Sequence, residues 1–332
     1  MIFQAPILAL LLVSALAALV SLWSAAFGVQ VLRHWDVASG AQSQIRLERA
    51  TELVSTLFGF VLVAEIAALL LFVYNADRMA ELFVGAMCAV GTLNVNAWGF
   101  PALYLKVAVF FAAALWLILD RADRLGRDYP LARVKYAALL PIAGLLVAAG
   151  AVELAYFLGL ETDVITSCCS KLFTPVNEGL AAEMTGLAPG KALWMLAGAG
   201  GIVAVTGAIS LATGRGQGWF ALAGGVLFAV ALAAIVSVIS LYVYDHPNHH
   251  CPFCLLQREH GYYGYLLYLP LFAGTAFALG AGVLRPFHRV GSLAGGLPAL
   301  TRRLVAAALV AYALFGLAVV WAIAASQLIL FG

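Results

Sequence analysis

The chain has 332 residues, of which 64% are apolar and 10% are charged, with a formal net charge of +2. A soluble domain is about 45–50% apolar and about 25% charged, so this composition excludes a soluble globular protein and a disordered chain. The small net charge excludes a nucleic-acid-binding protein, which needs a basic surface for phosphate. The composition therefore predicts an integral membrane protein whose main surroundings are membrane lipid.

Eight apolar stretches are long enough to cross the hydrocarbon layer as helices. They cover residues 5–32, 51–74, 100–120, 134–160, 191–213, 219–244, 262–284 and 304–330. Outer-membrane barrels show short alternating strands instead, so we predict an all-α bundle of about eight transmembrane helices, forming a single integral membrane domain over residues 1–332. A weak repeat of four plus four helices is conceivable, with residues 1–160 and 191–332 joined by an outer loop, 161–190.

Lys and Arg are distributed unevenly between alternate loops. Thirteen of the 18 lie in loops 33–50, 121–135, 214–218 and 285–303, whereas four lie in loops 75–99, 161–191 and 245–260. Loops rich in Lys and Arg remain in the cytoplasm. This bias predicts that both termini lie outside and that the protein is a multi-pass protein of the cell inner membrane.

All five cysteines then fall on the outer side of the membrane. They are Cys88, Cys168, Cys169, Cys251 and Cys254. The periplasmic or extracellular side is where disulfides persist, so this distribution favours redox chemistry or disulfide bonding there. The alternative is that the cysteines are scattered small hydrophobic residues in the core.

The densest polar stretch, residues 245–260, carries a CxxC pair at the outer mouth of the seventh span. Cys251 and Cys254 can close a small disulfide ring, and a helix start there would favour a thiolate. Arg258 follows Cys254 by four residues, so we expect the two to share a helix face. The guanidinium would then stabilise an anion, either a thiolate or a reduced quinone.

Residues 251–258, CPFCLLQR, followed by an aromatic-rich span, resemble the active-site segment of the disulfide-bond-formation protein B (DsbB) family. That family has a CxxC, two residues, a polar residue and Arg at a periplasmic helix entrance. The resemblance implies that Cys251 and Cys254 are the redox pair, that Cys254 faces a quinone (ubiquinone or menaquinone), and that Arg258 assists quinone binding. Gln257 and His250 are expected to belong to the same quinone site.

Members of that family have four spans and carry CxxC near the start of the chain, whereas here the motif precedes the seventh span. The candidate second pair, Cys168 and Cys169, lies upstream, an order similar to that of the vitamin K epoxide reductase (VKOR) family. By analogy we expect a membrane thiol–disulfide oxidoreductase. A soluble thioredoxin-fold partner at the outer face would exchange with Cys168 and Cys169 or directly with Cys251.

The adjacent Cys168 and Cys169 would form a strained, easily reduced bond with each other. One of them can instead pair with Cys88, which is otherwise the odd cysteine. A structural disulfide from Cys88 to this loop is therefore the alternative to a catalytic role for the upstream pair.

Two other functions fit the same residues. Histidines beside the CxxC form a patch of soft-metal ligands suited to Cu, Zn or Hg, which would make the chain a metal-binding or metal-transport protein. This patch comprises His246, His249, His250, Cys251 and Cys254. A structural subunit of a membrane complex, with disulfides that only brace the loops, is the third hypothesis.

Three charged residues, Glu65, Lys106 and Glu153, lie within the second, third and fourth spans. Charges inside the bilayer are costly and are by default functional. We expect Glu153 to supply protons to a quinone, with a Glu65–Lys106 ion pair as the structural alternative. Short amphipathic surface helices are expected over 78–90 and 176–185, and irregular backbone over 91–101.

Overall fold

The computed structural model describes residues 3–36, 39, 41–126, 128–161 and 188–328. These residues fold into helices joined by turns, and no strand occurs among them. Eight helical segments are long and apolar enough to cross a membrane. The prediction of an all-α protein with about eight spans is confirmed, and the chain is a multi-pass membrane protein. Which membrane it occupies, and on which side the termini lie, stay predictions.

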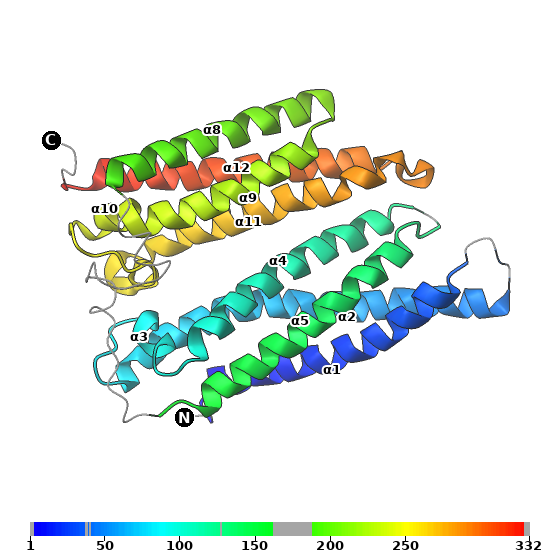
Figure 1. Cartoon of the computed structure of the whole chain (residues 1–332), viewed down its shortest axis with the longest axis horizontal. Helices are drawn as coiled ribbons and strands as arrows, with labels where there is room; N and C mark the ends of the chain where they lie inside the picture. The colour runs from blue at the N-terminus through cyan, green and yellow to red at the C-terminus, as the bar shows by residue number, and fades with distance from the viewer. Residues whose placement is uncertain (1–2, 37–38, 40, 127, 162–187, 329–332) are drawn as a thin grey trace. The chain divides into compact units, whose positions relative to one another are not determined.

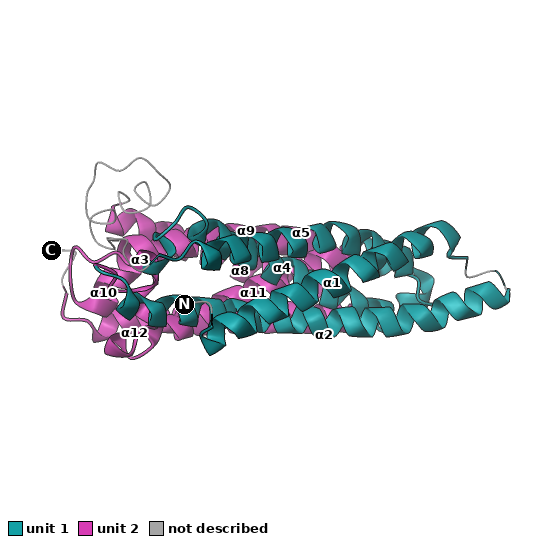
Figure 2. Cartoon of the chain, turned by 90° about the horizontal axis from the view of Figure 1, so that it is seen from below, with its two compact units in different colours: residues 1–84, 92–164, 286–297 teal, residues 85–91, 165–285, 298–332 magenta. Residues whose placement is uncertain are grey.

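The chain divides into two compact units (Figure 2). Unit 1 comprises Met1–Val84, Thr92–Val164 and Pro286–Leu297, and unit 2 comprises Gly85–Gly91, Ile165–Arg285 and Pro298–Gly332. The short segment Gly85–Gly91 lies between two parts of unit 1 in sequence but packs with unit 2. The helical repeat expected over 1–160 and 191–332 stays a prediction.

Unit 1 is a four-helix bundle (Figure 1). Its long helices pack in the cyclic order α1, α2, α4, α5, each against two neighbours. Their bounds are α1 Ala5–His34, α2 Gln42–Arg78, α4 Gly99–Asp123 and α5 Ala132–Leu158, with the short helices η1 Met79–Leu82, α3 Ala89–Leu93, η5 Arg285–Arg289 and η6 Gly291–Leu293 at the ends or borders of the unit.

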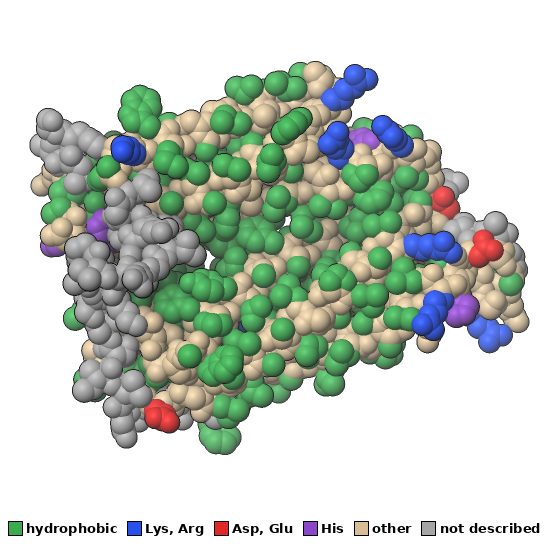
Figure 3. Space-filling model, in the orientation of Figure 1, with side chains coloured by type: hydrophobic (Ala, Val, Ile, Leu, Met, Phe, Trp, Pro, Cys, Tyr) green, Lys and Arg blue, Asp and Glu red, His purple; other side chains and the backbone are tan. Residues whose placement is uncertain are grey.

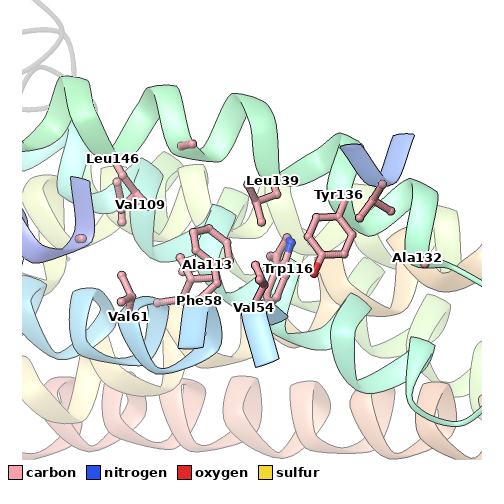
Figure 4. Packing of buried hydrophobic residues seen from close by; sticks show 14 of the residues in the cluster. Val54, Phe58, Val61, Val109, Ala113, Trp116, Ala132, Tyr136, Leu139 and Leu146 are labelled. Carbon is pink, nitrogen blue, oxygen red and sulfur yellow. The ribbon is translucent and has the colours of Figure 1, made fainter. Parts of the chain in front are cut away.

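Aromatic side chains fill the centre of unit 1 (Figure 4). The ring of Phe58 packs edge-on against Trp116 with centroids 4.9 Å apart, a contact that contributes about 0.5–1.5 kcal/mol beyond burial. Trp116 donates its indole N–H to the carbonyl of Lys135 over 3.1 Å. The hydroxyl of Tyr136 donates to the carbonyl of Thr51 over 3.0 Å. Each polar atom of these rings is thus satisfied inside an apolar core.

Unit 2 is built from four long helices and a loop region that carries the CxxC. The elements are α8 Pro189–Thr213, α9 Gln217–Ala234, the π-helix η2 Ile235–Ile239, α10 Ser240–Tyr244, η3 Cys254–Leu256, η4 Arg258–His260, α11 Tyr263–Leu284 and α12 Leu297–Ala325. Within unit 2, α9 packs against both α8 and α11.

Small residues allow the helices of unit 2 to approach closely. A Cβ on Gly224 would lie 2.8 Å from the hydroxyl of Tyr312, and a Cβ on Gly274 would lie 3.0 Å from its ring. Tyr312 therefore fits between the helices, where it contacts the Thr275 hydroxyl at 3.2 Å. Such close packing replaces the hydrophobic driving force that is lacking between helices in lipid.

Large apolar side chains remain exposed along the helices of both units, as expected for surfaces that face lipid (Figure 3). Leu12 and Phe60 are examples in unit 1, and Trp194 and Trp321 are examples in unit 2. On each unit most of the visible Lys and Arg gather near one end of the helices.

Three boundaries differ from the sequence-based expectation. The second span begins at Gln42 rather than at residue 51, because polar residues continue the helix beyond its apolar part. Residues 78–90 do not form one surface helix: η1 ends at Leu82 and α3 begins at Ala89. Residues 91–101 are irregular only in part, since α3 ends at Leu93 and α4 begins at Gly99. The helix expected over 176–185 lies outside the described residues.

Candidate functional site: a cluster of three cysteines

The loop that carries the CxxC starts where α10 ends at Asp245. Asp245 adopts a left-handed conformation, with φ of 50°, which stops the helix. Its carboxylate accepts hydrogen bonds from the Ser326 hydroxyl and, over 3.0 Å, from the Gln327 backbone N–H. The start of the loop is thereby attached to the C-terminal end of α12.

A histidine attaches the middle of the loop to the π-helix η2. His250 Nδ1 lies 2.9 Å from the carbonyl oxygen of Val236, which requires the tautomer with its proton on Nδ1. In a π-helix the backbone hydrogen bonds join residues five apart instead of four. This shift leaves a backbone carbonyl available to other donors. The Ser240 hydroxyl also donates to this oxygen, over 3.2 Å.

Two tyrosines hold the backbone of the CxxC itself. Tyr244 donates its hydroxyl to the carbonyl of Cys251, and Tyr268 donates to the carbonyl of Pro252 over 2.9 Å. A Cβ on Gly264 would lie 3.0 Å from the backbone of Leu255, so the glycine lets the turn of η3 rest directly on the first turn of α11. The position of the cysteines is therefore set by side chains from α10 and α11.

A third cysteine reaches this site from a distant part of the sequence. The Sγ atoms of Cys88 and Cys251 are 3.4 Å apart, and those of Cys88, Cys251 and Cys254 all lie within 4.8 Å of one another. The side-chain amide of Gln257 donates to the carbonyl of Met87 over 3.0 Å, which ties the two segments together. All three cysteines are buried, and all three belong to unit 2.

Mutual hydrogen bonding differentiates the sulfurs. Hydrogen bonds from the thiols of Cys254 and Cys88 lower the pKa of Cys251 well below its ordinary value, against the opposing effect of burial. The pKa of Cys254 is raised by its hydrogen bond to Cys251, by Cys88 and by burial. The hydrogen bonds therefore favour the thiolate form at Cys251 and the protonated form at Cys254. One nucleophilic sulfur beside a resolving thiol is the arrangement that thiol–disulfide exchange requires.

The expectation that Cys254 and Arg258 share a helix face is wrong. Cys254–Leu256 and Arg258–His260 are separate 3₁₀ turns, and Gln257 between them is extended with ψ of 158°. The helix that follows begins only at Tyr263. Gly261 and Tyr262 both adopt positive φ, which delays the start of α11. Arg258 is exposed on the loop.

Gln257 and His250, which were expected at a quinone site, use polar atoms to hold the loop. The amide nitrogen of Gln257 bonds to Met87 and His250 Nδ1 bonds to Val236. Glu153, the fourth residue expected there, belongs to unit 1.

The expected Cys/His metal patch is replaced by a set of cysteines. Among the residues that the structure describes, the group of three or more convergent metal-ligand atoms consists of Cys88, Cys251 and Cys254, without a histidine. His249 instead stacks on Tyr244 with ring centroids 4.0 Å apart. Burial lowers the pKa of His249, so the stacked ring is neutral at neutral pH.

The intramembrane charges of unit 1 form a buried polar layer. Lys106 Nζ lies 3.2 Å from Glu65 Oε2, 2.9 Å from Glu153 Oε2 and 3.0 Å from Ser14 Oγ. The expected Glu65–Lys106 ion pair is therefore confirmed, and Glu153 joins it. Each of the four helices of unit 1 contributes one of these side chains.

A second charged layer, buried except for the exposed Arg124, lies near the Lys/Arg-rich end of the bundle and was not predicted from the sequence. Lys135 Nζ lies 3.0 Å from Asp120 Oδ1 and 2.8 Å from Asp123 Oδ2, and Arg124 pairs with Asp120 at 2.7 Å. In the sequence these residues read as an ordinary cationic loop at the end of a span. The spacing of three and four residues that places Asp120, Asp123 and Arg124 together was the available signal.

The structural pairing expected between Cys88 and the loop at 168 and 169 stays a prediction, since Cys168 and Cys169 lie outside the described residues. The place of Cys88 beside Cys251 was also not expected from sequence. The position of Cys88 after the second span does not indicate that Cys251, 163 residues away, is its neighbour. No protein-family model, no curated protein and no solved structure matches this chain.

Proposed function

We propose that the protein is a membrane thiol–disulfide oxidoreductase whose reactive centre is the cluster of Cys88, Cys251 and Cys254. The observation that carries the proposal is the convergence of three buried sulfurs within 4.8 Å of one another. A disulfide bond is about 2.05 Å long, so a sulfur at 3.4 Å needs to move by little more than 1 Å to bond.

The proposed reaction moves two electrons and two protons from a dithiol to a membrane quinone. A thiolate of the donor attacks the Cys251 sulfur of an oxidised Cys251–Cys254 pair, the S–S bond breaks, and Cys254 leaves as a thiol. The second thiol of the donor then attacks the mixed disulfide between the donor and Cys251. The donor becomes a disulfide, and the Cys251 sulfur is released. The reduced pair gives two electrons and the Cys254 proton to the quinone, which takes its second proton from water and becomes a quinol while the Cys251–Cys254 bond re-forms.

Cys88 gives Cys251 a second partner within the protein. When the Cys88 sulfur attacks Cys251, a Cys88–Cys251 bond forms, the Cys251–Cys254 bond breaks, and one proton passes from Cys88 to Cys254. This step changes no oxidation state, so the cluster can present either Cys254 or Cys88 as the free thiol.

Burial of the cluster supports an indirect route for a folded donor protein. Cys251 is only 4% exposed and Cys88 is 0% exposed, which keeps a bulky partner from the sulfurs. We therefore assign the outer exchange step to Cys168 and Cys169, as in the order of cysteines in the VKOR-type proteins that the segment resembles. The soluble partner would be a thioredoxin-fold protein at the periplasmic face of the inner membrane.

The quinone contact is assigned to Arg258 alone. Its guanidinium is exposed beside the loop and can hold the negative charge of a reduced quinone, whereas Gln257 and His250 support the loop. The electron acceptor enters this proposal as a substrate, with ubiquinone and menaquinone as the two chemical classes to be compared.

The test is quinone reduction by protein reconstituted in lipid vesicles, with dithiothreitol as donor and a soluble ubiquinone or menaquinone analogue as acceptor. The wild type should reduce quinone faster than protein-free vesicles, and Cys251→Ser and Cys254→Ser should fall to that background. Arg258→Gln should raise the quinone KM, while the neighbouring exposed Glu259→Gln should not. Equal rates for wild type and Cys254→Ser would overturn the proposal.

A soft-metal site is the second candidate, because the same three sulfurs have suitable spacing. With metal–sulfur bonds of about 2.3 Å, three sulfurs in a plane around one ion are about 4 Å apart, within the observed 4.8 Å limit. Three thiolates suit Cu(I) or Zn. The residues of this site are Cys88, Cys251 and Cys254, so that Cys88 takes the place of the histidines that were expected beside Cys251 and Cys254.

Metal analysis of protein purified under reducing conditions separates the two candidates. One equivalent of copper or zinc that is lost in Cys88→Ser and retained in His249→Ala would favour the metal site. Absence of metal, together with a Cys251–Cys254 or Cys88–Cys251 disulfide found by thiol trapping and mass spectrometry after oxidation, would favour the oxidoreductase.

A further inference from the structure

The polar layer in unit 1 contains more negative than positive charge. Among the residues that the structure describes, Glu65 of α2 and Glu153 of α5 face one cation, Lys106 of α4, and α1 contributes the uncharged Ser14. Glu65, Lys106 and Glu153 are each no more than 2% exposed. If both carboxyl groups were ionised, the layer would hold one uncompensated negative charge within a membrane-spanning bundle, which is strongly unfavourable.

The second charged layer of unit 1 shows how the same bundle balances charge elsewhere. There, Asp120 and Asp123 face two cations, Lys135 and Arg124, so that the layer is neutral with all four groups ionised. Within the described part of the chain, the Glu65–Lys106–Glu153 layer has no counterpart of Arg124. Its missing positive charge must come from a bound species.

The hydrogen bonds of Glu153 indicate which species is bound. Its Oε2 atom accepts from the Ser14 hydroxyl and from Lys106 Nζ, whereas its Oε1 atom is buried and has no hydrogen-bond partner among the described residues. A buried oxygen without a hydrogen-bond partner costs more free energy in a carboxylate, where it carries part of the negative charge, than in a carboxylic acid, where it is the neutral hydroxyl. The asymmetry at Glu153 matches the acid.

We propose that Glu153 is a proton-binding site in the membrane-spanning part of unit 1 and that its carboxyl group carries a proton on Oε1 at neutral pH. The proton makes the layer neutral: Glu65 and Lys106 remain an ion pair, and Glu153 accepts from Ser14 and Lys106 through its carbonyl oxygen. Lys106 lies seven residues after the start of α4, about 10 Å along the helix from its end. The site therefore holds a bound proton within the membrane-spanning bundle, and it does not depend on the cysteine chemistry.

Infrared spectroscopy of the full chain in lipid nanodiscs tests this proposal, because a protonated carboxyl group has a carbonyl stretching band that a carboxylate lacks. The wild type at pH 7 should show one such band from a buried group. Glu153→Gln should abolish it. Glu153→Asp should move it, because an aspartic acid in a different hydrogen-bonding position replaces the glutamic acid.

Two further variants locate the proton. Glu65→Asp keeps the charge of the layer, so the band should remain where it is, and Asp123→Asn in the neutral layer should leave it unchanged. A band that moves in Glu65→Asp but not in Glu153→Asp would place the proton on Glu65 and overturn the assignment.

The wild type alone provides a test that does not depend on the folding of variants. Absence of the band in buffers with and without sodium would overturn the proposal. A band that appears only when sodium is replaced by choline would show a sodium site instead of a proton site, which also overturns it.

Discussion

The two units keep their ionisable groups in different kinds of structure. Unit 1 holds Glu65, Lys106 and Glu153 on three helices of the membrane-spanning bundle, whereas unit 2 brings Cys88, Cys251 and Cys254 together on loop segments outside its spans. A charge fixed by helices on all sides cannot leave without disturbing the bundle. A thiol on a loop tied down by a few hydrogen bonds can move by the 1 Å or so that bond exchange needs. Unit 1 therefore places these polar groups where they balance one another's charge, whereas unit 2 places these thiols where small movements are possible.

The largest effect is expected from removal of the lysine in unit 1. Lys106→Met leaves two buried glutamates without their cation, and loss of one partner of a buried ionic group typically destabilises a protein by about 3–5 kcal/mol. Thermal unfolding in nanodiscs, followed by tryptophan fluorescence, should show a large decrease in Tm. Lys191→Met, at an exposed position of α8, should change stability by about 0.5 kcal/mol or less. Equal Tm values for the two variants would show that the buried layer is not what stabilises unit 1.

A smaller effect, on acidity, should distinguish the thiols of unit 2. Cys254→Ala removes a hydrogen-bond donor to Cys251, and hydrogen bonds to charged groups contribute about 1.5–3 kcal/mol. The pKa of Cys251 should therefore rise in Cys254→Ala but stay low in Cys254→Ser, whose hydroxyl still donates. The ultraviolet absorbance of the thiolate, followed during a pH titration, measures the pKa of Cys251 in each variant.

The sign of the associated stability change follows from the same shift. Because the pKa of Cys251 is lower in the folded protein than in the unfolded chain, the thiolate contributes stability above the unfolded-state pKa. That contribution is lost as the pH falls through the folded-state pKa. In Cys254→Ala the loss should be complete at a higher pH than in the wild type, and the total contribution should be smaller. A titration that is identical in both variants would contradict the role assigned to Cys254.

The smallest effect is expected from the loop attachment at the π-helix. His250→Phe removes the hydrogen bond to the Val236 carbonyl, and because the Ser240 hydroxyl still donates there, the cost should be near 1 kcal/mol. Hydrogen exchange should show faster opening of residues 246–256, with unit 1 unchanged. If exchange of unit 1 increased equally, the loop would not be the separately mobile element that the comparison requires.

Sequence patterns predicted the spans well because lipid imposes a simple requirement. A helix must satisfy its own backbone hydrogen bonds and present apolar side chains over about 20 residues, and both features can be read along the chain. The CxxC at residues 251 and 254 and the charges at Glu65, Lys106 and Glu153 were also visible as local exceptions to that pattern. Arg258 was predicted wrongly. Its four-residue spacing from Cys254 suggested one helix face, but the extended Gln257 separates the two residues into different turns.

The amino-acid sequence by itself determined that this is a helical membrane protein with eight candidate spans and a CxxC pair beside one of them, because composition and spacing act locally. Only the tertiary structure decided that Cys88 joins Cys251 and Cys254, and that Glu153 shares Lys106 with Glu65. Both groupings join residues from separate parts of the chain, through helix packing in unit 1 and loop attachment in unit 2. The side chains that create such contacts carry no periodic signal along the sequence.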